Sequence, residues 1–166
     1  MKWPALAAVG AAVALSLAGC GGSSNDAAST ASLQKQADML AIDQIERTWH
    51  RAASTHDVDL MMSLWAPGAV FNIDQKTLAG KPAIRRWFLT ENKAFRPNHH
   101  WESDSPTYKI RIDLNGDKAT MYFECHYIDA KTSTVVGQAG VTHTLQKIDG
   151  KWLIINSSGS TATLGP

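Results

Sequence analysis

Residues 141–158, VTHTLQKIDGKWLIINSS, constrain the fold more than any other stretch of this chain. Two runs of alternating apolar and polar residues flank Asp149-Gly150, and an Asp-Gly pair in this position is a strong signal for a tight β-hairpin. Alternate residues of a strand share a face, so His143 is expected on an apolar face, and Asn156 on the face that carries Trp152. The stretch therefore predicts an antiparallel strand pair with a histidine and an asparagine among its apolar side chains.

The N-terminal 32 residues indicate an export signal followed by a tether. Lys2 precedes an uncharged run rich in Ala, Leu and Val, which is the layout of a secretory signal peptide. The junction Leu17-Ala18-Gly19-Cys20 resembles the bacterial lipobox, which implies cleavage before Cys20 and a lipid such as palmitate on its sulfur. We therefore expect a signal peptide at 1–19, a lipidated flexible tether at 20–32, and an exported protein anchored to the bacterial cell membrane or envelope.

Charge and cysteine content limit the partners of the folded part. Lys2, one of 16 basic residues, lies before Cys20, so the remaining 15 balance the 15 acidic residues. The longest basic run is Arg85-Arg86, which argues against nucleic acid as a partner. With Cys20 lipidated, Cys125 has no disulfide partner within the chain. A small buried apolar role is its simplest interpretation, and a nucleophile is the alternative.

The first part of the expected domain, residues 33–162, is predicted to be helical. From Leu33 to Thr55 apolar residues recur every three or four positions, which predicts an amphipathic helix with His50 on its exposed side. Asp57 is placed to cap a short helix over 58–65. Pro82 suits the first turn of a third helix, which ends before Arg96. Strands are expected at 69–73 and, more weakly, at 76–80.

From residue 99 onward the apolar period changes from 3.6 to 2 residues. Strands are expected over 99–113 with a bend near Ser105-Pro106, and then over 118–129, 135–148 and 151–160. The face of 118–129 that is expected to meet the core carries Met121, Phe123, Cys125 and Tyr127, and the outward face carries Tyr122, Glu124 and His126. Helices followed by a four-stranded antiparallel meander predict an α+β domain.

Five short motifs suggest a family. They are Asp57-Val-Asp-Leu60, Leu64-Trp-Ala66 with Ala69-Val-Phe71, Gly80-Lys-Pro-Ala-Ile84, Asn115-Gly-Asp-Lys-Ala119 and Asp149-Gly-Lys-Trp-Leu153. In this order they resemble the NTF2-like superfamily, in its SnoaL-like and scytalone-dehydratase-like branches. The resemblance implies a cone-shaped fold, in which a strongly curved, mainly antiparallel sheet wraps around about three N-terminal helices and encloses a pocket. It also implies a homodimer through the outer sheet face. Because this fold hosts dehydratases, isomerases, cyclases and binding proteins, it does not define a reaction.

Histidines are the first candidates for chemistry in such a pocket, because imidazole transfers protons near neutral pH. The resemblance to scytalone-dehydratase-like proteins implies a pocket histidine at His99 or His100. Adjacent strand residues point to opposite faces, and we favour His100. His143 is the second candidate, although a hydrogen-bonded core role is commoner for a histidine on an apolar face. If both face the pocket, His100 and His143 can bracket one ligand and move protons in a dehydration or isomerisation.

The remaining pocket residues are expected to be Trp65, Trp101, Tyr127 and Asn156, since ligand cavities combine aromatic walls with a few polar groups. Trp87 and Trp152 are expected to fill the core. The steroid isomerase site needs an aspartate base and an oxyanion hole of tyrosine and protonated aspartate. The resemblance puts Ile73 at the base position and Trp49 at the phenol position, so this activity is disfavoured. The spacing of histidine and cysteine predicts no metal site, and no motif predicts a cofactor.

Taken together, these features favour an envelope-anchored protein that binds a small hydrophobic or aromatic molecule in its pocket, with or without catalysis. One alternative is a cofactor-independent lyase or isomerase of the scytalone-dehydratase type that uses His100 and His143. Another is a protein-interaction module whose outer sheet face carries Tyr122, Glu124 and His126. Whether the protein is an enzyme is left open by the sequence.

Overall fold

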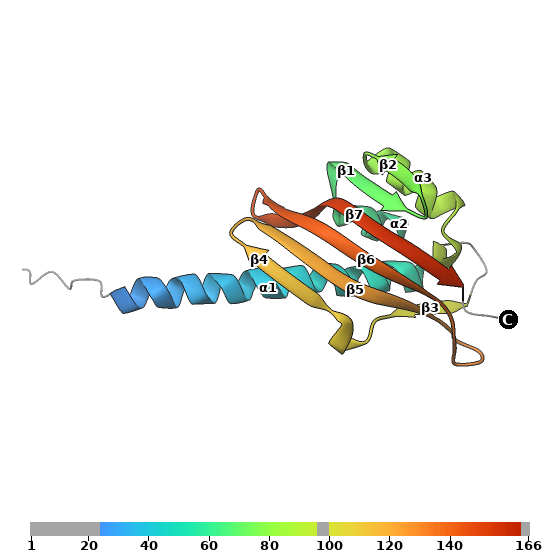
Figure 1. The fold of residues 1–166 in the computed structure, drawn as a ribbon, viewed down its shortest axis with the longest axis horizontal. Coiled ribbons are helices and arrows are strands. Elements are labelled where there is room, and N and C mark those ends of the chain that lie inside the picture. Colours follow the sequence, from blue (N-terminus) through green and yellow to red (C-terminus); the bar gives the residue numbers. More distant parts are fainter. Residues whose placement is uncertain (1–23, 96–99, 164–166) are drawn as a thin grey trace, which may run out of the picture.

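The computed structural model describes residues 24–95 and 100–163. A curved sheet lies against the long helix α1, with the shorter helices beside one edge of the sheet (Figure 1). The helices are α1 (Ser24–Thr55), α2 (Val58–Ser63) and α3 (Lys81–Thr90), with the short 3₁₀ turns η1 (Lys93–Phe95) and η2 (Thr107–Lys109). The strands are β1 (Trp65–Ile73), β2 (Lys76–Ala79), β3 (Trp101–Asp104), β4 (Arg111–Asn115), β5 (Lys118–Asp129), β6 (Thr134–Ile148) and β7 (Lys151–Thr163).

The seven strands form one sheet in the order β2-β1-β7-β6-β5-β3, and β4 also pairs with β5. All of these pairings are antiparallel except that of β1 with β7. The predicted α+β architecture and the meander from β4 to β7 are confirmed. The expected bend at Ser105-Pro106 separates β3 from β4. At the β6–β7 turn Asp149 and Gly150 have φ values of 50° and 78°, and a type I′ hairpin requires two such positive values.

The N-terminal part of α1 differs from the prediction. The helix begins at Ser24 rather than Leu33, so residues 24–32 of the predicted flexible tether are helical. Residues 27–36 are exposed, and the start of α1 projects beyond the sheet in Figure 1. Extending an existing helix adds one hydrogen bond for each residue that is fixed, which is far easier than starting a new helix. The predicted signal peptide and Cys20 lie outside the described residues.

The buried side of α1 is rotated from the prediction. Ala37 and Ala41 are exposed, while Ile42, which was not expected in the core, is fully buried. Three polar residues expected on the solvent side, Asp38, Glu46 and His50, are also buried. The residues of α1 that are buried are Asp38, Ile42, Ile45, Glu46, Trp49, His50, Ala52 and Ala53. Among the described residues, none of the helices combines the length and the hydropathy that crossing a membrane requires.

Two strand boundaries also differ from the prediction. The helix expected over 58–65 ends at Ser63, and β1 begins at Trp65 rather than Ala69. Trp65 pairs with Ile154 of β7, and the backbone N–H of Ile154 donates to the carbonyl of Leu64 at 2.8 Å. These contacts with a strand distant in sequence draw the end of the predicted helix into the sheet.

A β-bulge in β7 changes which of its residues face the core. Thr144 pairs with Asn156 and Leu145 pairs with Ile154, so Ile155 is an extra residue on β7. Strand residues alternate between faces, and one inserted residue exchanges the faces for the rest of the strand. As a result Ser157 is fully buried, whereas Asn156 is exposed. The prediction that Asn156 shares a face with Trp152 and Ile154 is therefore wrong.

Candidate functional site

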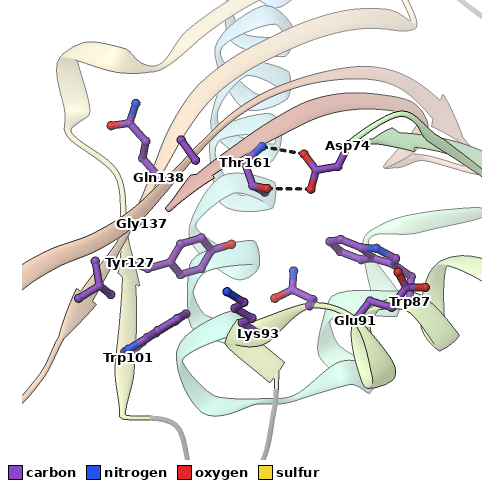
Figure 2. Close-up of a pocket in the computed structure, with 12 residues that line it drawn as sticks. Asp74, Trp87, Glu91, Lys93, Trp101, Tyr127, Gly137, Gln138 and Thr161 are labelled. Atoms are coloured by element: carbon purple, nitrogen blue, oxygen red, sulfur yellow. Dashed lines mark hydrogen bonds between the residues drawn. The ribbon is translucent and has the colours of Figure 1, made fainter. Parts of the chain in front are cut away.

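A cavity of about 220 Å³ lies where the ends of β5 and β7 and the start of β6 meet the C-terminal end of α3. Three aromatic side chains contribute to its wall, and so do two carboxylates and one ammonium group (Figure 2). The lining residues are Asp74, Trp87, Glu91, Asn92, Lys93, Trp101, Tyr127, Val136, Gly137, Gln138, Thr161 and Ala162. An apolar wall with a few polar groups is the usual composition of a small-molecule site.

Asp74 is positioned by the tight turn between β1 and β2. It has a φ of 46°, and aspartate is one of the few non-glycine residues that adopt this left-handed conformation readily. Its carboxylate accepts hydrogen bonds from Thr161, one from the backbone N–H at 2.9 Å and one from the hydroxyl at 2.7 Å (Figure 2). These bonds tie the β1–β2 turn to the end of β7 and hold the carboxylate at the cavity wall.

The opposite wall carries hydrogen-bond donors. Tyr127 follows Cys125 on the core-facing side of β5, and its hydroxyl points into the cavity (Figure 2). Burial raises the pKa of Tyr127 well above its usual value; Cys125 and the negative charge of Asp74 raise it further, and a hydrogen bond with Asn92 partly opposes the rise. The hydroxyl therefore stays protonated and can donate. Glu91 forms an ion pair with Lys76, which compensates its charge.

The structure brings two of the four predicted pocket residues to this cavity. Trp101 and Tyr127 line it, with their ring centroids 6.2 Å apart. Trp65 is instead fully buried in the core, where its ring packs 5.2 Å from that of Phe71. Asn156 is exposed on the other side of β7, as a consequence of the bulge.

His100 lies just before β3 and does not line the cavity. Its Nε2 is 2.6 Å from Oδ2 of Asp129, and its side chain is 40% exposed. The same carboxylate accepts hydrogen bonds from the backbone N–H groups of Lys131 and Thr132. Although partial burial opposes it, these bonds and His100 lower the pKa of Asp129. His100 therefore contacts the end of β5 rather than the cavity. His99 lies outside the described residues.

His143 is fully buried in the core of the sheet. Its Nδ1 is 2.9 Å from Oγ of Ser157, and among the described residues Nε2 has no hydrogen-bond partner. The rings of Trp49 and Phe123 lie 5.0 and 5.3 Å from the imidazole. Burial lowers the pKa of His143 to about 3, so the ring is neutral at physiological pH. The structure thus separates His100 from His143, and the predicted pair does not surround a common ligand.

A polar cluster behind the cavity was missed by the sequence interpretation. Nδ1 of His50 is 2.7 Å from Oγ of Ser103 and 3.6 Å from Sγ of Cys125, and Nε2 of His50 is 2.8 Å from Oε1 of Glu46. The Glu46 contact is an ion pair whose angle is unsuitable for a hydrogen bond. Burial lowers the pKa of His50, but Cys125 and Glu46 raise it more, to about 9. The four-residue spacing of Glu46 and His50 beside Ile42, Ile45 and Trp49 was the available signal.

Strands β3 and β5 connect this polar cluster to the cavity. Ser103 is the cross-strand partner of Tyr127, and Cys125 precedes Tyr127 by two positions on the same face of β5. Cys125, which was expected to be a small buried apolar residue, is fully buried and contacts Oγ of Ser103 at 2.9 Å. Across the described ranges, no three side chains of histidine, cysteine, aspartate or glutamate converge in a way that suits a metal ion.

Comparison with known proteins identifies the family. Residues 34–157 match the SnoaL-like domain, so the chain belongs to this family. The NTF2-like cone fold is also found in solved structures. One is an NTF2-like protein with a cystatin-like fold from Novosphingobium aromaticivorans, with 15% identity, a TM-score of 0.68, and coverage of 79% of this chain and 86% of the other. The predicted fold class is therefore confirmed.

Two further neighbours are LinA and a protein described as a putative dehydratase. LinA has 16% identity and a TM-score of 0.67, and the match covers 81% of this chain and 92% of LinA. A putative dehydratase of the NTF2-like family from Streptomyces avermitilis has 13% identity and a TM-score of 0.61, with coverage of 78% of this chain and 99% of the other. At this identity the likeness establishes the fold alone. No curated protein matches the chain.

Proposed function

We propose that this SnoaL-like protein binds a small aromatic or apolar molecule in the cavity beside Tyr127. The observation that carries the proposal is the wall formed by Trp87, Trp101 and Tyr127 around a volume of about 220 Å³. An apolar cavity of about 150 Å³ holds benzene, and drug-sized ligands occupy roughly 300–1,000 Å³. The expected ligand is therefore one substituted ring, or an apolar molecule of similar size.

Binding without catalysis is supported by the position of the histidines. His143 is sealed in the core and His100 pairs with Asp129 outside the cavity, so neither is placed to exchange a proton with a ligand there. A dehydratase-type reaction through these two residues has no structural support. Binding is the function that requires only groups present in the cavity.

Fluorescence titration tests the proposal, since Trp87 and Trp101 lie in the wall. One-ring compounds such as toluene, phenol and benzoate should change the emission saturably. Trp101→Ala removes a wall and should weaken binding about tenfold or more. Trp152→Phe is the matched control, because Trp152 is buried beside Asp38 and does not line the cavity. If no small ring binds, or if Trp101→Ala binds unchanged, the proposal is wrong.

We further propose that lipid on Cys20 anchors the protein to the bacterial cell envelope. The lipobox-like junction supports this part, together with the start of α1, which projects from the end of the domain opposite β3 and the end of β7 (Figure 1). An anchor at that end leaves the cavity facing away from the membrane. Cys20→Ser should move the protein from the membrane fraction to the soluble fraction. Retention of the variant in the membrane fraction would contradict the anchor.

A further inference from the structure

The cavity has walls of opposite polarity, and this restricts its ligand more than size does. In Figure 2 the carboxylate of Asp74 lies on one side of the cavity. In the same view the ammonium of Lys93 and the hydroxyl of Tyr127 lie away from that carboxylate, and both residues line the cavity. One wall therefore presents hydrogen-bond acceptors and the other presents donors.

The acceptor wall has unused capacity. The two oxygens of Asp74 receive one hydrogen bond each from Thr161, and an ionised carboxylate offers about four acceptor positions. Both donors from Thr161 are neutral, so they leave the negative charge uncompensated. The electric field of this carboxylate reaches Tyr127, because it contributes to the raised pKa of that residue.

The donor wall is also unsaturated. Lys93 lies in η1 and is exposed, and within the described ranges no carboxylate forms an ion pair with its ammonium. Glu91, the nearest acidic residue in sequence, is paired with Lys76 instead. An ammonium group has three donors and no acceptor. The protonated hydroxyl of Tyr127, which also interacts with Cys125 and Asn92, adds to the polarity of this wall. A carboxylate or carbonyl group satisfies this wall best.

The two walls together define the ligand class. We propose that the cavity binds a single aromatic ring that carries a carboxylate at one end and a hydroxyl or amino group at the other, as 4-hydroxybenzoate and 4-aminobenzoate do. This inference rests on the proposed function and deepens it. The carboxylate meets Lys93 and Tyr127, the ring lies among the aromatic side chains, and the opposite donor reaches Asp74.

The test compares ligands that differ by one group, by calorimetric titration of the full chain. 4-Hydroxybenzoate should bind more tightly than benzoate, by about tenfold or more, because benzoate lacks the donor for Asp74. It should exceed its methyl ester by a similar factor, because the ester lacks the charge that faces Lys93. Toluene, which has neither group, should bind more weakly than all three.

Variants assign each preference to a wall. Asp74→Asn should abolish the preference for 4-hydroxybenzoate over benzoate, and Lys93→Gln should abolish the preference for the acid over its methyl ester. Each preference is a ratio of two affinities measured on the same variant, and the affinity for toluene reports any general change in the cavity. Lys118→Gln is the matched control, since Lys118 is exposed at the start of β5, away from the cavity.

The outcomes separate the inference from the proposed function. If toluene and 4-hydroxybenzoate bind equally well, the cavity is an apolar site and the polar inference is wrong. If the preferences survive Asp74→Asn and Lys93→Gln, these residues do not recognise the ligand. If no compound in the series binds, both the inference and the proposed small-ring function fail. The comparison of ligands on the unaltered protein decides the inference even if one variant does not fold.

Discussion

Replacing His143 should make the stability of the protein less sensitive to acid. The imidazole is fully buried between Trp49 and Phe123, and its pKa is lowered from 6.5 to about 3 because burial disfavours the charged form. The unfolded chain therefore binds a proton that the folded chain does not bind, at every pH between these two values. The contribution of the neutral, buried imidazole to the free energy of unfolding is therefore complete above pH 6.5 and is lost as the pH falls toward 3.

The size of the effect follows from the width of this window. One pH unit within it corresponds to about 1.4 kcal/mol, so the free energy of unfolding should fall by about 2.5 kcal/mol between pH 7 and pH 4.5 on account of His143 alone. This is a large fraction of the 5–15 kcal/mol that is usual for a domain. His143→Gln keeps a hydrogen-bonding side chain beside Ser157 but cannot titrate, so the variant should lack this loss.

Urea unfolding followed by tryptophan fluorescence, at pH values from 4.5 to 7, measures the effect. Ser157→Ala is the control, because it removes the hydrogen bond to Nδ1 and keeps the imidazole in its apolar surroundings. It should cost about 1 kcal/mol and retain the pH dependence of the unaltered protein. Parallel curves for the unaltered protein and His143→Gln would refute the reasoning, as would an NMR titration of His143 with a midpoint near 6.5.

Three further predictions concern the remainder of the fold. The pKa of His50 is raised to about 9, which corresponds to a contribution to stability of about 3 kcal/mol. This contribution is present below pH 6.5 and is lost as the pH rises through 9. Glu46→Gln should reduce the loss, as measured by urea unfolding between about pH 6 and 9.5. Gly150→Ala should cost about 1 kcal/mol because φ is 78°, whereas Gly68→Ala, also free of close contacts but without a positive φ, should cost less, and equal melting temperatures would contradict this. Deleting Ile155 removes the bulge but leaves Leu145 opposite Ile154, Thr144 opposite Asn156 and each residue of β7 on its present face, so thermal unfolding should stay cooperative with a lowered midpoint; loss of the cooperative transition would contradict this.

The elements that local sequence specifies were the most predictable. The hairpin at Asp149-Gly150 follows from two residues that tolerate a positive φ, and in the turn before β5 Gly116 alone adopts one, at 61°. The alternation in β5 placed Cys125 and Tyr127 toward the core and Glu124 outward, as the structure confirms. Such patterns depend on the backbone period of a single strand.

The candidate site was less predictable because it is built from segments far apart in the chain. Trp101 and Tyr127 were expected at the cavity, but Asp74 reaches it only because Thr161 of β7 binds its carboxylate. Lys93 reaches it from a 3₁₀ turn that no periodicity indicates. His100 does not line the cavity and instead contacts the carboxylate of Asp129. Long-range pairing decided each of these positions, and a local pattern contains no information about it.

The sequence by itself determined the family, the helix-then-meander order and the turns, since these depend on period, capping and permitted φ values. Only the tertiary structure decided which faces of α1 and β7 are buried. Two or three neighbouring positions on a helix are nearly equivalent until a sheet packs against them. His50 could therefore be placed only by its contacts with Ser103 of β3 and Cys125 of β5, and Glu46 lies beside it on the same helix. The one-residue bulge at Ile155 is set by the pairing of β7 with its neighbours, and it moved Asn156 out of the core and Ser157 into it.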